Sequence, residues 1–392
     1  MQRRFEELDS LRGIAAVAVI FHHYLYLLPP ICDQQRLPEF ELITHTPLHI
    51  FWAGREAVLF FFVLSGFVLS LPFQDRKVPY GQFIAKRICR IYIPYLAAVC
   101  LAFGARHVFA RGGIPELSSW FNSTWTDPIT MRAAAEHFLL IGYFNNMQFD
   151  PVLWSLVHEM RISIIFPALM LMVTRAKWQT ALAAGFVISG AAHFFTGHFH
   201  AFPIPEQDYI MTLHFIIMFV VGALMARHRW LLMERYARLA KPVKVALALL
   251  ASVLYTYKWS VLPDVKLLHI YYFDDLMTTA GVCIFILTGL AAPSASRMLT
   301  AKPLVFTGRI SYSIYLLHAI LLLTFVNVLY GVAPLWTILP MTLVSTFGLS
   351  ALMYKMVEEP SINVGRKLAA SLPRQNRARA TVAGGPRASG TY

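Results

Sequence analysis

Long apolar runs, broken by short polar and basic segments, divide the chain from end to end. Six runs contain no Asp, Glu, Lys or Arg, namely residues 13–32, 57–74, 178–205, 209–226, 276–296 and 310–354. Each is long enough to cross a bilayer, and the last is long enough to cross twice, with a break near Gly331–Pro334. Three less clean apolar segments begin near Ile91, Val152 and Val245. The pattern predicts an all-α polytopic membrane protein with about ten transmembrane helices.

Composition and charge agree with this reading. Only 14% of the residues are charged, against about 25% in soluble domains. The net charge of +13 could indicate a nucleic-acid partner, but Lys and Arg collect in cytoplasmic loops of membrane proteins. If the N-terminus is inside, 25 of the 34 basic residues fall in inner segments and seven in outer ones. The distribution therefore predicts that both termini are cytoplasmic, with membrane lipids and no nucleic acid as partners.

The first predicted helix carries a cation and two histidines. His23 follows Arg12 by eleven positions, which at about 100° per residue brings both to within about 20° of one helix face, about 16 Å apart along the axis. His22 lies about 80° away from that face. Ionisable groups are costly in lipid and are retained mainly for function. This face thus offers a fixed cation near one membrane surface and a candidate general base inside the bilayer.

Two further spans carry small or basic residues, and each set of residues allows two interpretations. Ser65–Gly66 lies inside an aromatic helix, where small residues usually allow close helix packing, although a catalytic serine is the alternative. Arg87 and Arg90 are three residues apart and share a helix face at the predicted inner boundary. They read either as positive-inside anchors or as a clamp for phosphate, which Arg binds in bidentate geometry.

The fourth span begins with a polar cluster formed by Trp154, His158, Glu159 and Arg161. Glu159 is predicted about 10 Å below the outer surface, and His23 about 18 Å above the inner one. With a hydrocarbon core of about 30 Å, the two side chains fall at nearly the same level. The sequence therefore predicts that they meet, with Glu159 orienting His23 and stabilising its imidazolium.

A second histidine stripe opens the ninth span. Ser311, Tyr315 and His318 follow the spacing i, i+4, i+7 and share one helix face, which we expect to line the same cavity. The four cysteines are scattered without metal-like spacing, so no disulfide and no metal site is expected. Residues 1–370 are predicted to form one membrane domain, and the basic tail 371–392 is predicted to be disordered.

Together these motifs resemble the acyltransferase-3 family of integral-membrane O-acyltransferases. The resemblance covers about Phe5 to Lys367. It rests on Arg12 and His23 with ten residues between them, the Phe61–Phe67 segment, Arg87-x-x-Arg90, Trp154-Ser-Leu-x-x-Glu159, the Ser311–His318 segment and the Glu359-Pro360 ending. Each motif alone is weak, whereas six in the family's order are specific.

The resemblance implies transfer of an acyl group, most often acetyl from acetyl-CoA as co-substrate, onto a hydroxyl of a carbohydrate or glycolipid. No tightly bound cofactor is expected, and the location implied is the inner (plasma) membrane. The family pattern carries catalytic roles to His23 and Glu159 and donor binding to Arg12, Arg87 and Arg90. The chain resembles members that lack an appended extracellular hydrolase-like domain.

Seven further residues, of which His22 and Arg161 are additions to the family pattern, are candidates for lining the substrate cavity. They are His22, Ser65, Trp154, His158, Arg161, Tyr315 and His318. Buried His and Glu would also suit a proton relay in a transporter or flippase of a polar lipid or sugar. The absence of an evident inverted repeat counts against that alternative. A sensor or scaffold would leave the shared face of Arg12 and His23 unexplained.

Overall fold

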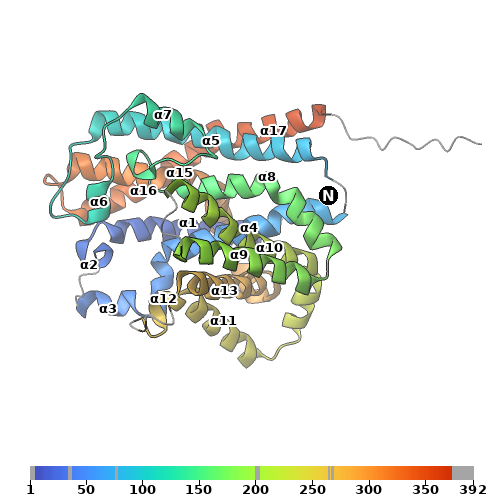
Figure 1. Cartoon of the computed structure of the whole chain (residues 1–392). Coiled ribbons are helices and arrows are strands. Elements are labelled where there is room, and N and C mark those ends of the chain that lie inside the picture. The colour runs from blue at the N-terminus through green and yellow to red at the C-terminus, as the bar shows by residue number, and fades with distance from the viewer. Residues whose placement is uncertain are drawn as a thin grey trace, which may run out of the picture.

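A computed structural model describes residues 5–33, 38–75, 78–198, 204–263, 265 and 269–372, and within these ranges it is helical, with one isolated bridge between Tyr330 and Ala333 and no strand (Figure 1). The longer helices are α1 (Glu6–Tyr26), α4 (Gly54–Asp75), α5 (Tyr80–Phe109), α8 (Leu153–Arg175), α9 (Trp178–His198), α10 (Ile204–Ala237), α11 (Lys241–Tyr255), α13 (Tyr271–Ala291), α15 (Lys302–Leu329), α16 (Leu335–Met353) and α17 (Glu359–Ser371). The short elements are α2 (Pro29–Cys32), α3 (Pro38–Thr44), η1 (Pro47–Trp52), α6 (Ser119–Ser123), α7 (Met131–Phe138), η2 (Asn146–Gln148), α12 (Tyr257–Ser260), α14 (Pro293–Leu299) and the π-helical η3 (Tyr354–Glu358).

Seven of the described helices are long and apolar enough to cross a membrane. They are α4, α5, α8, α10, α13, α15 and the continuous stretch from α16 through η3 to α17. The other three predicted spans form α1, α9 and α11, which are helical but fall outside that set; α11 has only 15 residues. An all-helical, multi-pass architecture is thus confirmed, while the count of ten and the side of the termini stay predictions. The predicted tail lies outside the described residues from residue 373 onward.

Helices α1 and α4 are packed within the bundle, and glycines set how closely their neighbours approach. A Cβ atom on Gly308 of α15 would lie 2.1 Å from the carbonyl oxygen of Asp9 in α1. A Cβ atom on Gly66 of α4 would lie 2.2 Å from the carbonyl oxygen of Phe219 in α10. Neither contact tolerates a side chain, as expected where small residues drive packing of membrane helices. The packing role predicted for Gly66 is therefore present.

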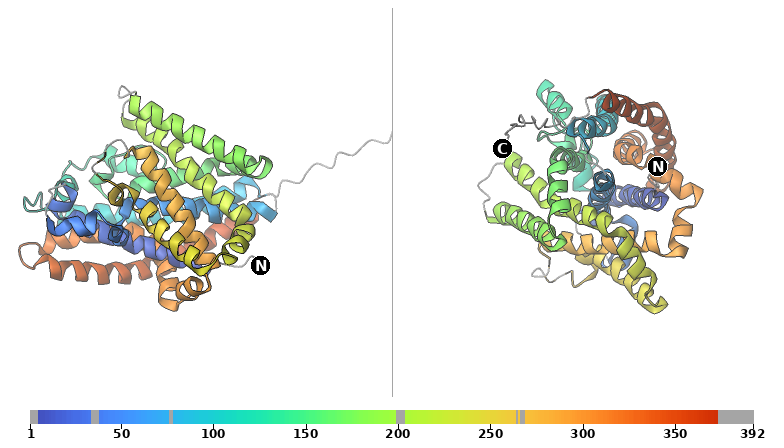
Figure 2. Two further views of the ribbon diagram at one scale, coloured as in Figure 1. Left: turned by 90° about the horizontal axis from the view of Figure 1, so that it is seen from below. Right: turned by 90° about the vertical axis from the view of Figure 1, so that its right-hand side faces the viewer.

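The segments predicted to be cytoplasmic gather at one end of the bundle. Ser296 donates a hydrogen bond to Glu7 (2.8 Å), and Gln82 donates to the carbonyl of Leu372 (3.3 Å). The short helices α2, α3, α6 and α12 lie at the opposite end (Figure 1). Figure 2 shows the bundle from below and from the end that carries the N-terminus. The segments predicted to lie on opposite sides of the membrane thus lie at opposite ends of the bundle. This arrangement does not fix which end faces the cytoplasm.

The connection between α5 and α8 folds into the bundle and fixes the depth at which α8 begins. Trp125 donates through its indole N–H to the carbonyl of Phe149 (2.9 Å), and Asp150 is fully buried. Burial raises the pKa of the Asp150 carboxyl well above its usual range. Tyr315, 13 residues into α15, donates to the carbonyl of Val152 (3.1 Å). Helix α8 therefore starts at the level of Tyr315, about 20 Å along α15.

Topology can be tested with single cysteines placed in a variant whose four native cysteines are replaced by alanine. We expect Lys241→Cys, exposed at the start of α11, to be shielded from an impermeant thiol reagent in intact cells. Ser123→Cys, exposed at the end of α6, should be labelled. The opposite labelling pattern would overturn the charge-based topology.

Candidate active site

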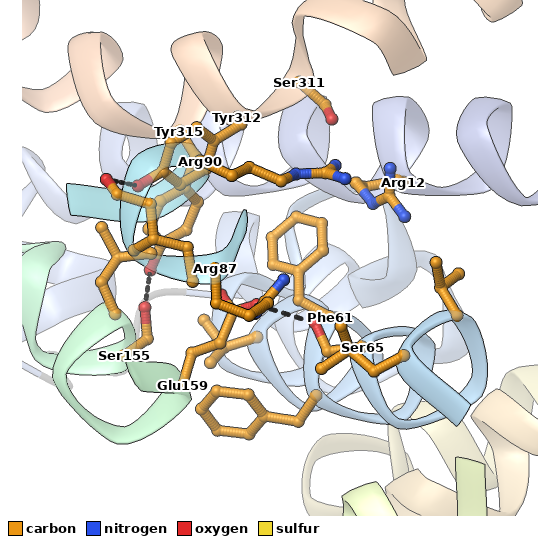
Figure 3. A pocket seen from close by; sticks show the side chains of 16 residues that line it. Arg12, Phe61, Ser65, Arg87, Arg90, Ser155, Glu159, Ser311, Tyr312 and Tyr315 are labelled. Carbon is orange, nitrogen blue, oxygen red and sulfur yellow. Dashed lines mark hydrogen bonds and ion pairs between the residues drawn. The ribbon is translucent and has the colours of Figure 1, made fainter. Parts of the chain in front are cut away.

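A narrow cavity of about 100 Å³ lies between five helices, α1, α4, α5, α8 and α15 (Figure 3). The charged side chains that line it are Arg12, Arg87, Arg90 and Glu159. Its polar and aromatic lining consists of Ser65, Ser155, Ser311, Phe61, Phe62, Tyr312 and Tyr315, and aliphatic side chains complete it. Three arginines and one carboxylate leave the cavity with net positive charge.

Glu159 and Arg87 form an ion pair at the wall of this cavity. Arg87 Nη2 lies 2.8 Å from Glu159 Oε1, and the same oxygen accepts a hydrogen bond from Ser65 (3.0 Å). Arg87 also donates to Ser163 from Nε (3.2 Å) and Nη2 (3.0 Å). The guanidinium is 9% exposed and its donors are largely committed inside the protein. Arg87 therefore holds Glu159 in place. Because its N–H donors are used in these contacts, Arg87 has few donors left for a ligand.

Arg12 and Arg90 are the cations best placed to bind an anion. Figure 3 shows both reaching into the cavity from different helices, α1 and α5. Within the described residues, the one ion pair of Arg12 joins its Nη1 to Asp9 at 3.2 Å. Arg90 is exposed and, among the described residues, has no ion pair. Two guanidinium groups that face one cavity suit phosphate oxygens. The described residues hold no cluster that could bind a metal ion.

His23 lies beyond the Tyr315 end of the cavity, against His318 of α15. His23 Nδ1 is 3.0 Å from the carbonyl oxygen of Val19 and 3.1 Å from His318 Nε2. His318 Nδ1 is 3.0 Å from the carbonyl oxygen of Ile314. A carbonyl can only accept, so both Nδ1 atoms carry protons and His318 Nε2 is the acceptor. His23 Nε2 is then left unprotonated, and no described residue donates to it.

The predicted contact between Glu159 and His23 is wrong. No hydrogen bond or ion pair joins them among the described residues; Glu159 pairs with Arg87, and His23 pairs with His318. The cause is the depth of α8, which begins at the level of Tyr315. Glu159 lies about 6 Å inward of Ser155, the residue that bonds Tyr315, and His318 lies about 5 Å outward of Tyr315. The acid and the base are therefore about two helical turns apart.

Three predicted cavity residues lie on another face of α8. His158 Nδ1 is 2.9 Å from Thr212, and Arg161 pairs with Asp208 at 2.6 Å, both on α10. Trp154, one turn before His158, contacts that histidine at a ring separation of 5.9 Å. Because His158 is one residue and Arg161 two residues from Glu159, they point about 100° and 200° away from it. None of the three lines this cavity.

Two predicted histidines also lie outside the cavity, whereas Ser65 and Tyr315 line it as predicted. His22 packs against Gly54, where a Cβ atom would lie 2.3 Å from the imidazole, and against Tyr26 at a ring separation of 4.1 Å. His318 stands one turn outward of the cavity, with its ring 5.9 Å from that of Tyr315. His22 thus points away from the His23–His318 pair, as its helical phase predicts.

Three residues at the site were not among the predicted ones. Ser155 and Ser163 lie four residues before and after Glu159, so the i, i+4, i+8 spacing in α8 was the available signal. Trp120 of α6 packs on His23 with ring centroids 5.1 Å apart. No pattern in the sequence links that loop residue to α1, because the contact depends on how the α5–α8 connection folds back.

The fold and this cavity define a polytopic membrane protein with a cationic cavity and a histidine pair within the bundle. A family model described as an acyltransferase domain matches residues 5–355. The O-acetyltransferase OatA of Staphylococcus aureus (strain NCTC 8325 / PS 47) is 23% identical over 397 residues, covering 94% of this chain and 59% of OatA. The acyltransferase MdmB of Streptomyces mycarofaciens is 28% identical over 337 residues, covering 80% of this chain and 78% of MdmB. No solved structure matches the chain.

The chain belongs to the acyltransferase-3 family, and the resemblance drawn from its motifs is confirmed. The chain spans about 59% of the length of OatA, so the activity of that whole protein is not carried over to it.

Proposed function

We propose that the protein transfers an acyl group, acetyl in the first instance, from acyl-CoA to a hydroxyl of a carbohydrate or glycolipid at the plasma membrane. The observation that carries the proposal is the orientation of His23. Its Nδ1 proton is held by Val19 and His318, which directs the basic Nε2 away from both. A histidine in this tautomer is suited to general-base catalysis near neutral pH.

The proposed reaction needs one proton acceptor and no covalent intermediate. His23 Nε2 takes the proton of the acceptor hydroxyl while that oxygen attacks the thioester carbonyl. The new C–O bond forms, the C–S bond breaks, and the departing CoA thiolate receives the proton from the imidazolium. His318 is a positioning residue in this scheme, because its Nε2 accepts from His23 Nδ1 and stabilises the charge that develops on the ring.

The donor is proposed to enter from the end that holds Arg12 and Arg90. CoA carries phosphates at one end and a pantetheine thioester at the other, and the phosphates suit a cavity that is lined by Arg12 and Arg90. Tyr315 is hydrogen-bonded to Ser155 (2.7 Å) and packs edge-to-face against Phe61. It closes the cavity toward His318. The thioester would therefore reach the histidine pair past Tyr315.

The acceptor is proposed to approach from the opposite end, where Trp120 covers His23. One face of a pyranose ring is made of C–H groups, which pack on an indole ring. Trp120 would then position the sugar while His23 takes the proton of one hydroxyl. This arrangement places donor and acceptor on opposite sides of the histidine pair.

Transfer is tested directly by incubating the purified protein with radiolabelled acetyl-CoA and a panel of surface glycans and glycolipids. We expect label to appear in the ester-linked, base-labile fraction of the acceptor. A flippase would instead move a fluorescent lipid-linked sugar across a proteoliposome without incorporating label. That outcome would replace the proposed function with transport.

The donor clamp predicts a KM effect at Arg90. Arg90→Ala should raise KM for acetyl-CoA about tenfold or more, since a hydrogen bond to a charged group contributes about 1.5–3 kcal/mol. Arg90→Lys should recover only part of the loss, because Lys lacks the bidentate fork. Acceptor KM should change little.

Lys86→Ala provides the matched control, because Lys86 is an exposed cation on the same helix that does not line the cavity. The KM of Lys86→Ala for acetyl-CoA should equal that of the unaltered protein. If Arg90→Ala lowers membrane abundance but leaves kinetics per molecule unchanged, Arg90 acts only as a topological anchor.

A further inference from the structure

A second, larger cavity opens between α9, α10 and α13, away from the candidate active site. Its volume is about 1020 Å³ and its lining is almost wholly apolar. Residues from all three helices contribute, including Trp178 and Phe186 of α9 and Met277 and Ile284 of α13. Several of these large apolar side chains are exposed, Trp178 by 50% and Phe186 by 39%. The cavity is therefore a groove open to the surface of the membrane domain.

One face of α10 forms the floor of this groove and changes character along its length. Ile217, Val221 and Leu224 follow one another at intervals of four and three residues, and all line the groove. The same face continues with His228 and Arg235, which also line it. From Ile217 to His228 the face is about 16 Å long, close to half of a hydrocarbon core of about 30 Å. The groove is thus apolar over one leaflet and basic at the predicted inner end.

The basic end lacks protein partners. His228 Nε2 is buried and has no hydrogen-bond partner among the described residues. Arg235 is exposed and forms no ion pair within the described part of the chain, whereas the neighbouring Glu234 pairs with Arg238 instead. A buried nitrogen and a free guanidinium one above the other on a helix, at i and i+7, call for an anionic ligand.

We propose that this groove is a binding site for an anionic phospholipid. One acyl chain lies along the apolar floor between Trp178 and Met277, and the phosphate is bound by Arg235 and His228. Charge complementarity selects an anionic headgroup, and the length of the apolar floor matches an acyl chain of the adjacent leaflet. The site is separate from the acyl-transfer site, because the groove and the catalytic cavity share no lining residue.

The test is native mass spectrometry of the full-length protein titrated with phosphatidylglycerol, phosphatidylcholine or glycerol 3-phosphate. We expect one phosphatidylglycerol to bind more tightly than phosphatidylcholine, and glycerol 3-phosphate not to bind. Arg235→Ala should weaken phosphatidylglycerol about five-fold, the contribution of one basic residue near an anionic headgroup. Arg238→Ala is the matched control and should leave binding unchanged.

A second variant tests the proposed acyl-chain site of the groove independently of charge. Ala280→Trp, which fills the groove from α13, should weaken both phospholipids. Unchanged binding in Ala280→Trp, or an equal effect of Arg235→Ala and Arg238→Ala, would overturn the proposal. Arg235 is exposed, so its replacement remains informative if Ala280→Trp does not fold. Equal affinity for the two phospholipids would show an unselective lipid surface and would also overturn it.

Discussion

Replacing His23 with alanine is expected to lower kcat for acyl transfer by about a hundred- to ten-thousand-fold, the range for loss of a general base. The contacts of His23 Nδ1 with the Val19 carbonyl and His318 leave its Nε2 lone pair free and directed away from both partners. KM for acetyl-CoA should change little, because the cations that face the donor lie on the other side of Tyr315. The measurement is initial-rate kinetics on purified protein, normalised to folded enzyme.

His22 supplies the matched control for this prediction. The two histidines are adjacent in α1, yet His22 packs on Gly54 and Tyr26 while His23 faces His318. His22→Ala should therefore retain most of the transfer rate per folded molecule. The transfer rate of His318→Ala should lie between those of His22→Ala and His23→Ala, since His23 Nδ1 keeps its hydrogen bond to the Val19 carbonyl. An inactive His22→Ala beside a normal His23→Ala would refute the assignment of the base.

Properties that belong to a single helix could be predicted from the sequence. The phase of α1 separates His22 from His23, and the structure places them against different neighbours as expected. The stripe of Ser311, Tyr315 and His318 likewise faces the site from α15. Period and spacing are enough in such cases, because a helix fixes its own side-chain directions.

Relations between helices could not be predicted in the same way. The depth of Glu159 follows from the sequence only if α8 begins at the membrane surface, whereas the preceding segment folds inward and starts α8 at the level of Tyr315. Spacing within α8 also does not determine which face turns toward α5, and the structure turns His158 and Arg161 toward α10. Both differences concern how rigid helices dock, which depends on loop folding and on close-packing glycines.

Glu159→Gln is expected to destabilise the protein by about 3 kcal/mol, because it leaves the buried guanidinium of Arg87 without its counter-charge. Ser65 and Ser163 can still bond the two side chains, so the loss is mainly electrostatic. The measurement is the free energy of unfolding in mixed detergent micelles titrated with dodecyl sulfate. The exposed pair of Arg132 and Glu136 is the matched control, and Glu136→Gln should have no measurable effect.

The double variant Arg87→Met/Glu159→Leu separates the stability of this pair from its part in the reaction. Apolar replacement of both partners of a buried ion pair is often neutral, so we expect most of the lost stability to return. Acyl transfer should not return with it, because the cavity wall then presents two apolar side chains where Glu159 and its bound Ser65 stood. A double variant that is stable and fully active would show that the pair only holds α5 against α8. If the two single substitutions instead prove additive, the ion pair contributes no coupling energy and the geometry assigned to the site is wrong.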